Sequence, residues 1–173
     1  LADPGNPFSV IEQVDTRATA GTVTETTYTA GSEKRIVTTS HLGRDRVRAL
    51  DELGREVMTQ TEGLHPVRRV YDPRGRVLAI NEGPEPETSE TRTTTLGYWE
   101  TSDHRNGLLW WVQDPLGRTI HLDYDAAGRI VEGTLPDGRM LHGVSADNGN
   151  LSSITPPGRP AHVFGYTPMN PEA

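Results

Sequence analysis

Few side chains in this sequence have the types and spacing that catalysis or metal binding requires. Cysteine is absent, which excludes a thiolate nucleophile, a disulfide framework and a cysteine-based metal site. The six histidines lack the close HxH or HxxxH pairing of metal ligands. Adjacent Asp103 and His104 form a candidate acid/base pair, but neighbours in a turn need the fold to bring their side chains together. We therefore expect no enzymatic activity, no cofactor and no metal ion.

The three tryptophans all fall within residues 96–112, around a turn predicted at Asn106-Gly107. Two interpretations are open. In the first, exposed indoles beside a histidine stack on sugar rings, and the hairpin is a carbohydrate- or surface-binding module. In the second, which we favour, the rings fill the local core and bury ~150 to 250 Å² each. The candidate glycan-binding residues are Tyr98, Trp99, His104, Trp110 and Trp111.

The geometry of this aromatic hairpin is predictable in part. Trp99 should face either Trp110 or Trp111, because cross-strand neighbours on one face of a sheet lie close together. Trp110 and Trp111 are adjacent in sequence. If their strand is regular, they should point to opposite faces.

These residues belong to a chain of repeats. From Gly107 to Gly149 a glycine returns every ten or eleven residues, and four glycines close the phrase Asp-x-x-Gly-Arg. Gly31 and Gly43 begin the same spacing earlier in the chain. The predicted turn residues are Asp51, Gly54, Arg55, Asp72, Gly75, Arg76, Asp114, Gly117, Arg118, Asp125, Gly128, Arg129, Asp137, Gly138, Asn148 and Gly149.

The residue types of the phrase predict a hairpin turn with a bulge. An aspartate at the first position accepts a hydrogen bond from the backbone N–H two residues on, and glycine supplies the positive φ that closes the turn. Proline after the aspartate, as at Pro73 and Pro115, presets the backbone angle. We expect each arginine after a turn glycine to pair with a nearby aspartate or to cover the strand surface with its stem.

Segments of about five to seven residues separate the turns, which suits strands and is too short for helices. One segment alternates cleanly: Ile120, Leu122 and Tyr124 face one way, and Thr119, His121 and Asp123 face the other. Abundant threonine adds strand propensity without adding a core. The expected fold class is all-β, built of repeated antiparallel β-hairpins; the curved, spiralling β-strip expected of them is what the family resemblance described below implies.

The whole chain, residues 1–173, is expected to be a single region of such hairpins. We divide it into an atypical leading repeat at 1–30, an acidic, proline-containing loop at 81–95, the aromatic hairpin at 96–112 and the most regular repeats at 113–166. Hydrophobic residues make up only 33% of the chain, which is little for a compact sandwich but enough for a sheet with one solvated face. A formal net charge of −7 argues against nucleic-acid binding. No apolar run approaches the ~20 residues that a membrane-spanning helix needs.

Tyr71-Asp72-Pro-Arg-Gly-Arg and Tyr124-Asp125-Ala-Ala-Gly-Arg resemble the YD repeat of the Rhs family. The phrases LPDGR at 135–139 and SADNGNLSSIT at 145–155 match the way such repeats continue. The resemblance implies a long hairpin strip that spirals into a hollow shell. In bacterial polymorphic toxins and in the C component of insecticidal toxin complexes, such shells enclose a C-terminal toxin, and in teneurins a related shell belongs to an adhesion protein.

The resemblance therefore implies a structural role. We expect this chain, which begins at Leu1, to be a fragment of a shell wall in a larger protein that is secreted or displayed on a bacterial cell surface. Its partners would be the rest of the shell and an enclosed toxin or effector, with a glycan as the alternative partner. An isolated segment exposes strand edges, so we also expect it to self-associate or to be marginally stable.

Overall fold

The computed structural model describes residues 9–19, 22–30, 34–84 and 88–166, and in these ranges the chain is built of antiparallel strands without any helix. The prediction of an all-β fold of repeated antiparallel hairpins is therefore confirmed. The strands are β1 (Glu12–Thr19), β2 (Thr22–Ala30), β3 (Lys34–Thr39), β4 (Asp45–Leu50), β5 (Glu56–Thr61), β6 (Val67–Tyr71), β7 (Val77–Glu82), β8 (Arg92–Tyr98), β9 (Leu109–Gln113), β10 (Thr119–Tyr124), β11 (Ile130–Thr134), β12 (Met140–Ser145), β13 (Leu151–Thr155) and β14 (His162–Val163).

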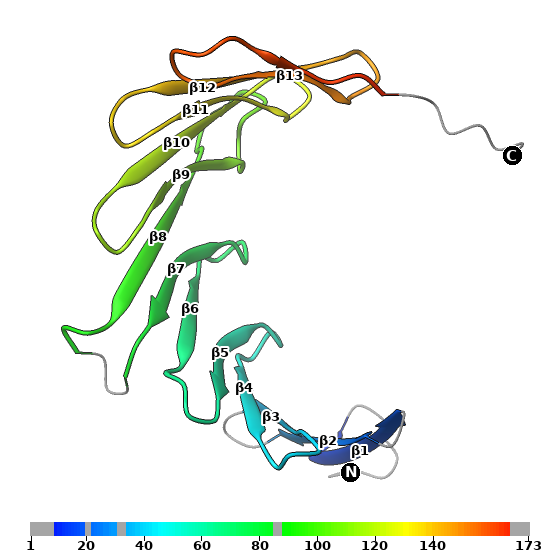
Figure 1. Cartoon of the computed structure of the whole chain (residues 1–173). Helices are drawn as coiled ribbons and strands as arrows, with labels where there is room; N and C mark the ends of the chain where they lie inside the picture. Colours follow the sequence, from blue (N-terminus) through cyan, green and yellow to red (C-terminus); the bar gives the residue numbers. More distant parts are fainter. Residues whose placement is uncertain (1–8, 20–21, 31–33, 85–87, 167–173) are drawn as a thin grey trace, which may run out of the picture. The chain divides into compact units, whose positions relative to one another are not determined.

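The chain divides into two compact units, Leu1–Thr93 and Thr94–Ala173. In each unit every strand pairs with the strand that precedes or follows it in sequence, so the order of strands in the sheet is their order in the chain. Figure 1 shows these strands side by side, joined by short turns at alternating ends. Such a meander contains local pairings only, which is the arrangement that evenly spaced turns dictate.

Strand pairing in the second unit gives its sheet two chemically different faces. Ile120 lies opposite Val112, and Leu122 lies opposite Gly133. On the other face, His121 lies opposite Thr134, and Asp123 lies opposite Glu132. Along β10 apolar and polar side chains thus alternate between the two faces, as the alternation of residues 119–124 predicts.

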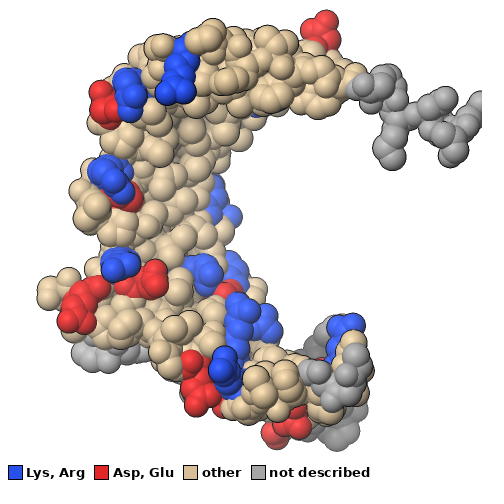
Figure 2. Space-filling view, in the orientation of Figure 1, with Lys and Arg blue, Asp and Glu red and all other residues tan. Residues whose placement is uncertain are grey.

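Neither unit has a conventional hydrophobic core. Among the described residues no apolar side chain is fully buried, and the buried polar side chain is Asp72, which is 7% exposed. Much of the visible face of the second unit carries no charged side chain, and its charged groups lie mostly at the margin (Figure 2). The strands are therefore held chiefly by pairing with their neighbours and by contacts at the turns.

The two segments in which the sequence repeat is irregular also contain strands. Within residues 1–30, β1 and β2 form an eight-pair ladder from Glu12 opposite Thr29 to Thr19 opposite Thr22. In the 81–95 segment, β7 ends at Glu82 and β8 begins at Arg92, so both ends of the segment lie in strands. Gly31 and residues 85–87 lie outside the described residues.

Candidate functional site

The aspartate of each Asp-x-x-Gly-Arg phrase organises a complete hairpin turn. At Asp51 the backbone N–H donates to the carbonyl of Arg55 over 2.9 Å, and the N–H of Gly54 donates back to the Asp51 carbonyl over 3.0 Å. Asp51 Oδ1 accepts from the N–H groups of Leu53 and Arg55 at 3.0 and 2.8 Å. Gly54 has φ 79°, a conformation that side chains disfavour. The neighbouring strand register shifts by one residue, which marks the bulge.

The arginine that ends the phrase closes this turn with an ion pair to the same aspartate, and we call the combination a turn clasp. Arg55 Nε lies 2.6 Å from Asp51 Oδ2. Equivalent clasps join Arg76 to Asp72 at 2.7 Å, Arg118 to Asp114 at 2.5 Å and Arg129 to Asp125 at 2.6 Å. The turn glycines Gly75, Gly117 and Gly128 likewise have positive φ.

Two later turns have the same backbone hydrogen bonds, but the residue whose side chain accepts hydrogen bonds lies two positions later in the turn. In LPDGR, the backbone turn begins at Leu135, and Asp137 supplies the carboxylate that accepts from the backbone N–H and the guanidinium of Arg139. Asn148 occupies the corresponding place in the next turn, where its side-chain oxygen accepts from the Asn150 N–H at 3.1 Å. Gly138 and Gly149 have φ 79° and 87°.

Hydrogen bonding in the clasps lowers the pKa of their carboxyl groups. For Asp114 the main cause is the hydrogen bond from the Arg118 side chain, and for Asp125 it is the hydrogen bond from the Arg129 backbone. At Asp72 partial burial acts to raise the pKa, but the hydrogen bonds and charge of Arg76 outweigh burial and hold it below its usual 3.8. These aspartates are thus anions with structural partners, a poor basis for acid/base catalysis near neutral pH.

The tyrosine that precedes a clasp ties the opposite strand end into the turn. Tyr71 Oη donates to the carbonyl of Glu56, and Tyr124 Oη donates to the carbonyl of Leu109, both at 2.8 Å and both across 15 residues. Tyr166 repeats the spacing with Leu151 at 2.9 Å. The sequence phrase contains these tyrosines, but only strand pairing shows which carbonyl each one reaches.

A clasp arginine also contacts the next turn on the same side of the sheet. The Arg55 guanidinium lies 4.7 Å from the centre of the Tyr71 ring and donates to the Asp72 carbonyl at 3.4 Å. In the second unit, Arg129 donates to the carbonyl of Ala146 at 3.1 Å. Both contacts span 17 residues, so each unit contains a tie of this kind between successive turns on that side of the sheet.

The aromatic hairpin places Trp99 against Trp110, with ring centres 4.9 Å apart. Trp111 has a different role: its indole lies across Gly97, where a β-carbon would come within 2.1 Å of the ring nitrogen. The register shifts between Gly97 and Tyr98, which pair with Trp111 and Leu109 and leave Trp110 in a bulge. The strand is therefore not regular at Trp110, and the prediction that Trp110 and Trp111 point to opposite faces, which assumed a regular strand, does not apply.

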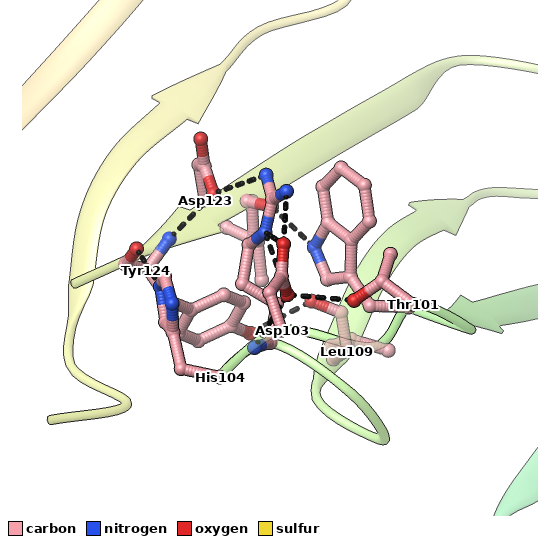
Figure 3. A network of polar contacts seen from close by, with 9 residues as sticks. Thr101, Asp103, His104, Leu109, Asp123 and Tyr124 are labelled. Carbon is pink, nitrogen blue, oxygen red and sulfur yellow. Dashed lines mark hydrogen bonds and ion pairs between the residues drawn. The ribbon is translucent and has the colours of Figure 1, made fainter. Parts of the chain in front are cut away.

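The loop between β8 and β9 folds over the end of β10 (Figure 3). Arg105 Nη2 lies 2.6 Å from Asp103 Oδ2, its Nη1 lies 3.4 Å from Asp123 Oδ1, and its guanidinium lies 4.2 Å from the Trp99 ring centre. His104 Nε2 is 3.1 Å from the carbonyl oxygen of Tyr124. The hydrogen bond from the Arg105 side chain is the main reason that the pKa of Asp103 is far below its usual value. The two residues of the candidate acid/base pair thus contact different groups: Asp103 pairs with Arg105, and His104 contacts the Tyr124 carbonyl.

A groove of about 300 Å³ opens beside the stacked tryptophans and is the candidate binding site of this chain. Trp110 is 39% exposed. A larger hollow in the first unit, about 570 Å³, has arginines and no aromatic side chain in its lining. The tryptophan groove, by contrast, joins aromatic rings to a few polar groups, as ligand sites do. Its lining residues are Trp99, Trp110, His121, Leu122, Asp123, Glu132 and Thr134.

The structure brings together only part of the predicted glycan-binding set. Trp99 and Trp110 line the groove, whereas Tyr98, His104 and Trp111 are not among its lining residues. Sequence reasoning missed Asp123 and Glu132 because they lie on different strands and become neighbours only through register. The signal that was available is the alternation of polar residues along 119–123.

No family model matches this sequence, and no curated protein matches it. Within the part of the chain that the structure describes, no three histidine, aspartate or glutamate side chains are grouped as metal ligands would be. No helix in that part is long and apolar enough to cross a membrane.

Proposed function

We propose that this chain is a structural repeat segment of an Rhs-type β-shell, a curved and spiralling strip that encloses a C-terminal toxin or effector. The shell would act in interbacterial competition or in toxicity toward a host, as part of a larger protein that is secreted or carried on the bacterial surface. The rest of the shell and the enclosed polypeptide are the partners.

The observation that carries this proposal is the recurrence of the same ties without a buried core. Clasps and tyrosine hydrogen bonds recur at the strand ends, while no apolar side chain among the described residues is fully buried. A globular domain of this length would bury many apolar residues. The wall of a shell needs each strand to be held in register with the next. The clasps and tyrosine hydrogen bonds of this chain can do so.

Limited proteolysis of the longer protein that contains this sequence tests the proposal. Mass spectrometry should find a C-terminal polypeptide that survives together with a protease-resistant repeat region, and the polypeptide should become sensitive once the shell is denatured. The same polypeptide expressed alone is the control, and it should be degraded rapidly. Rapid loss of everything beyond an intact repeat region in the native protein would overturn the proposal.

A second candidate function, carbohydrate binding, is favoured by one observation: the partly exposed Trp110 lies on a groove together with Trp99. The C–H-rich face of a sugar ring packs on an indole, while sugar hydroxyls need hydrogen-bond acceptors beside it. Saccharide titrations followed by tryptophan fluorescence test this function. Indifference to every saccharide would leave the wall as the only role proposed.

A further inference from the structure

The charge around the tryptophan groove points to the class of saccharide it would accept. We infer that the groove binds neutral or amino sugars and rejects sugars that carry carboxylate or sulfate groups, an inference that rests on the proposed carbohydrate-binding function. Two features of the groove support the inference. The aromatic platform would bind the face of a sugar ring, and the two carboxylates at its edge would discriminate between sugars by charge.

The platform comes from Trp110, whose ring is partly exposed and is backed by Trp99 at 4.9 Å. Trp99 is itself fixed by the Arg105 guanidinium over its ring and by a 3.3 Å hydrogen bond from its Nε1 to the carbonyl of Leu122. The His121 ring centre lies 6.0 Å from the Trp110 ring centre, and His121 also lines the groove. A ligand therefore meets a preformed aromatic surface, which reduces the entropy that binding costs.

The carboxylates come from Asp123 and Glu132, which lie directly opposite each other on β10 and β11. Each has one basic neighbour: Arg105 is 3.4 Å from Asp123, and His142 is 3.3 Å from Glu132 and is charged only when protonated. Arg105 also pairs with Asp103. Asp103, Asp123 and Glu132 thus carry three carboxylates against the one permanently charged cation, Arg105, so the groove is net negative when His121 and His142 are neutral. The Asp123 and Glu132 carboxylates supply acceptors at its edge. Hydroxyl and ammonium groups satisfy such acceptors, whereas an acidic sugar would place like charges side by side.

Isothermal titration of the full 173-residue chain with three tetrasaccharides of equal length tests the inference. The probes are a neutral glucose oligomer, a glucosamine oligomer with free amines and an oligomer that contains glucuronate. We expect the first two to bind at least tenfold more tightly than the acidic probe. Trp110→Ala should abolish binding, whereas Leu116→Ala, which removes from the turn between β9 and β10 a 77% exposed side chain that does not line the groove, should leave binding unchanged.

Glu132→Gln tests the charge argument separately, because it keeps the size of the side chain and removes its charge. The preference for neutral over acidic saccharide should shrink several-fold in this variant. Asp147→Asn removes the same charge from the exposed turn after β12 and should leave the preference intact. Circular dichroism checks that each variant keeps its strands.

The outcomes separate the two claims. Tighter binding of the acidic probe, or an equal effect of Glu132→Gln and Asp147→Asn, would overturn the inferred sugar class while carbohydrate binding stands. Absence of binding for all three probes at millimolar concentration would overturn both.

Discussion

At the scale of single residues, each turn carboxylate accepts several hydrogen bonds that hold its hairpin turn together. Each clasp aspartate accepts backbone and guanidinium hydrogen bonds at once, so its charged form is stabilised in the folded chain. Asp72 shows the extreme case, since it is also the most buried polar side chain described. A carboxamide in its place would accept one set of these hydrogen bonds and present a donor to the others.

This arrangement predicts a loss of stability in acid. The pKa values of Asp51, Asp72, Asp114 and Asp125 are lower in the folded chain than the usual 3.8, so folding favours the deprotonated form. The stabilisation is complete well above pH 3.8 and is lost as the pH falls through that value toward the lower pKa of the folded state. Thermal unfolding between pH 7 and pH 2.5 should show a falling midpoint. A midpoint that is flat below pH 4 would contradict the clasp argument.

Removal of a tie-forming tyrosine hydroxyl should lower the stability of the folded chain. Tyr71→Phe and Tyr124→Phe each delete a 2.8 Å hydrogen bond to a backbone carbonyl, and each should lower the free energy of unfolding by about 1 kcal/mol. Tyr28→Phe is the matched control, because Tyr28 pairs with Ile36 in a strand and its hydroxyl has no hydrogen bond in the described structure. Urea unfolding measures all three. An equal change in the free energy of unfolding at all three positions would mean that the tyrosine hydrogen bonds do not stabilise the fold.

At the scale of elements, the hairpin turns could be predicted from the sequence, and the tryptophan groove could not. The phrase Asp-x-x-Gly-Arg contains every group its turn uses, so residue types and spacing suffice. The groove depends on a bulge at Trp110 and on the pairing of Asp123 with Glu132, which are properties of register. Alternation along residues 119–123 assigns Asp123 to a face, but no local pattern shows which residue of the next strand lies opposite it, which is why Asp123 and Glu132 were missed.

The bulged hairpin also explains Gly97, a strand glycine that no turn requires. The Trp111 indole occupies the space above it, so Gly97→Ala should displace the ring and destabilise the hairpin by about 1 to 3 kcal/mol. Gly133→Ala is the control, because a β-carbon there would meet a Leu122 methyl at an ordinary 4.0 Å. Near-ultraviolet circular dichroism and chemical unfolding report the two effects. Unchanged tryptophan signals in Gly97→Ala would show that the ring does not rest on the glycine.

At the scale of the whole molecule, a sheet without a closed core raises the question of its edges. Among the described residues, β1 is paired on one side only, by β2, and all eight of its side chains are exposed. Unpaired N–H and C=O groups along such a strand bind other strands. At the other end of the strand order, β14 has only two residues and offers a much shorter edge.

We therefore expect the chain to self-associate through β1. Sedimentation velocity over a hundredfold concentration range should show an average mass that rises with concentration. Val14→Lys adds a charge in the middle of β1, where Val14 is 52% exposed, and should weaken association several-fold. Leu42→Lys adds the same charge at a 67% exposed position in the turn after β3 and should have no such effect. Because both variants change the net charge equally, a difference between them assigns association to the strand edge. A chain that is monomeric at every concentration would contradict this assignment, since an open edge of eight residues would then have no consequence in solution.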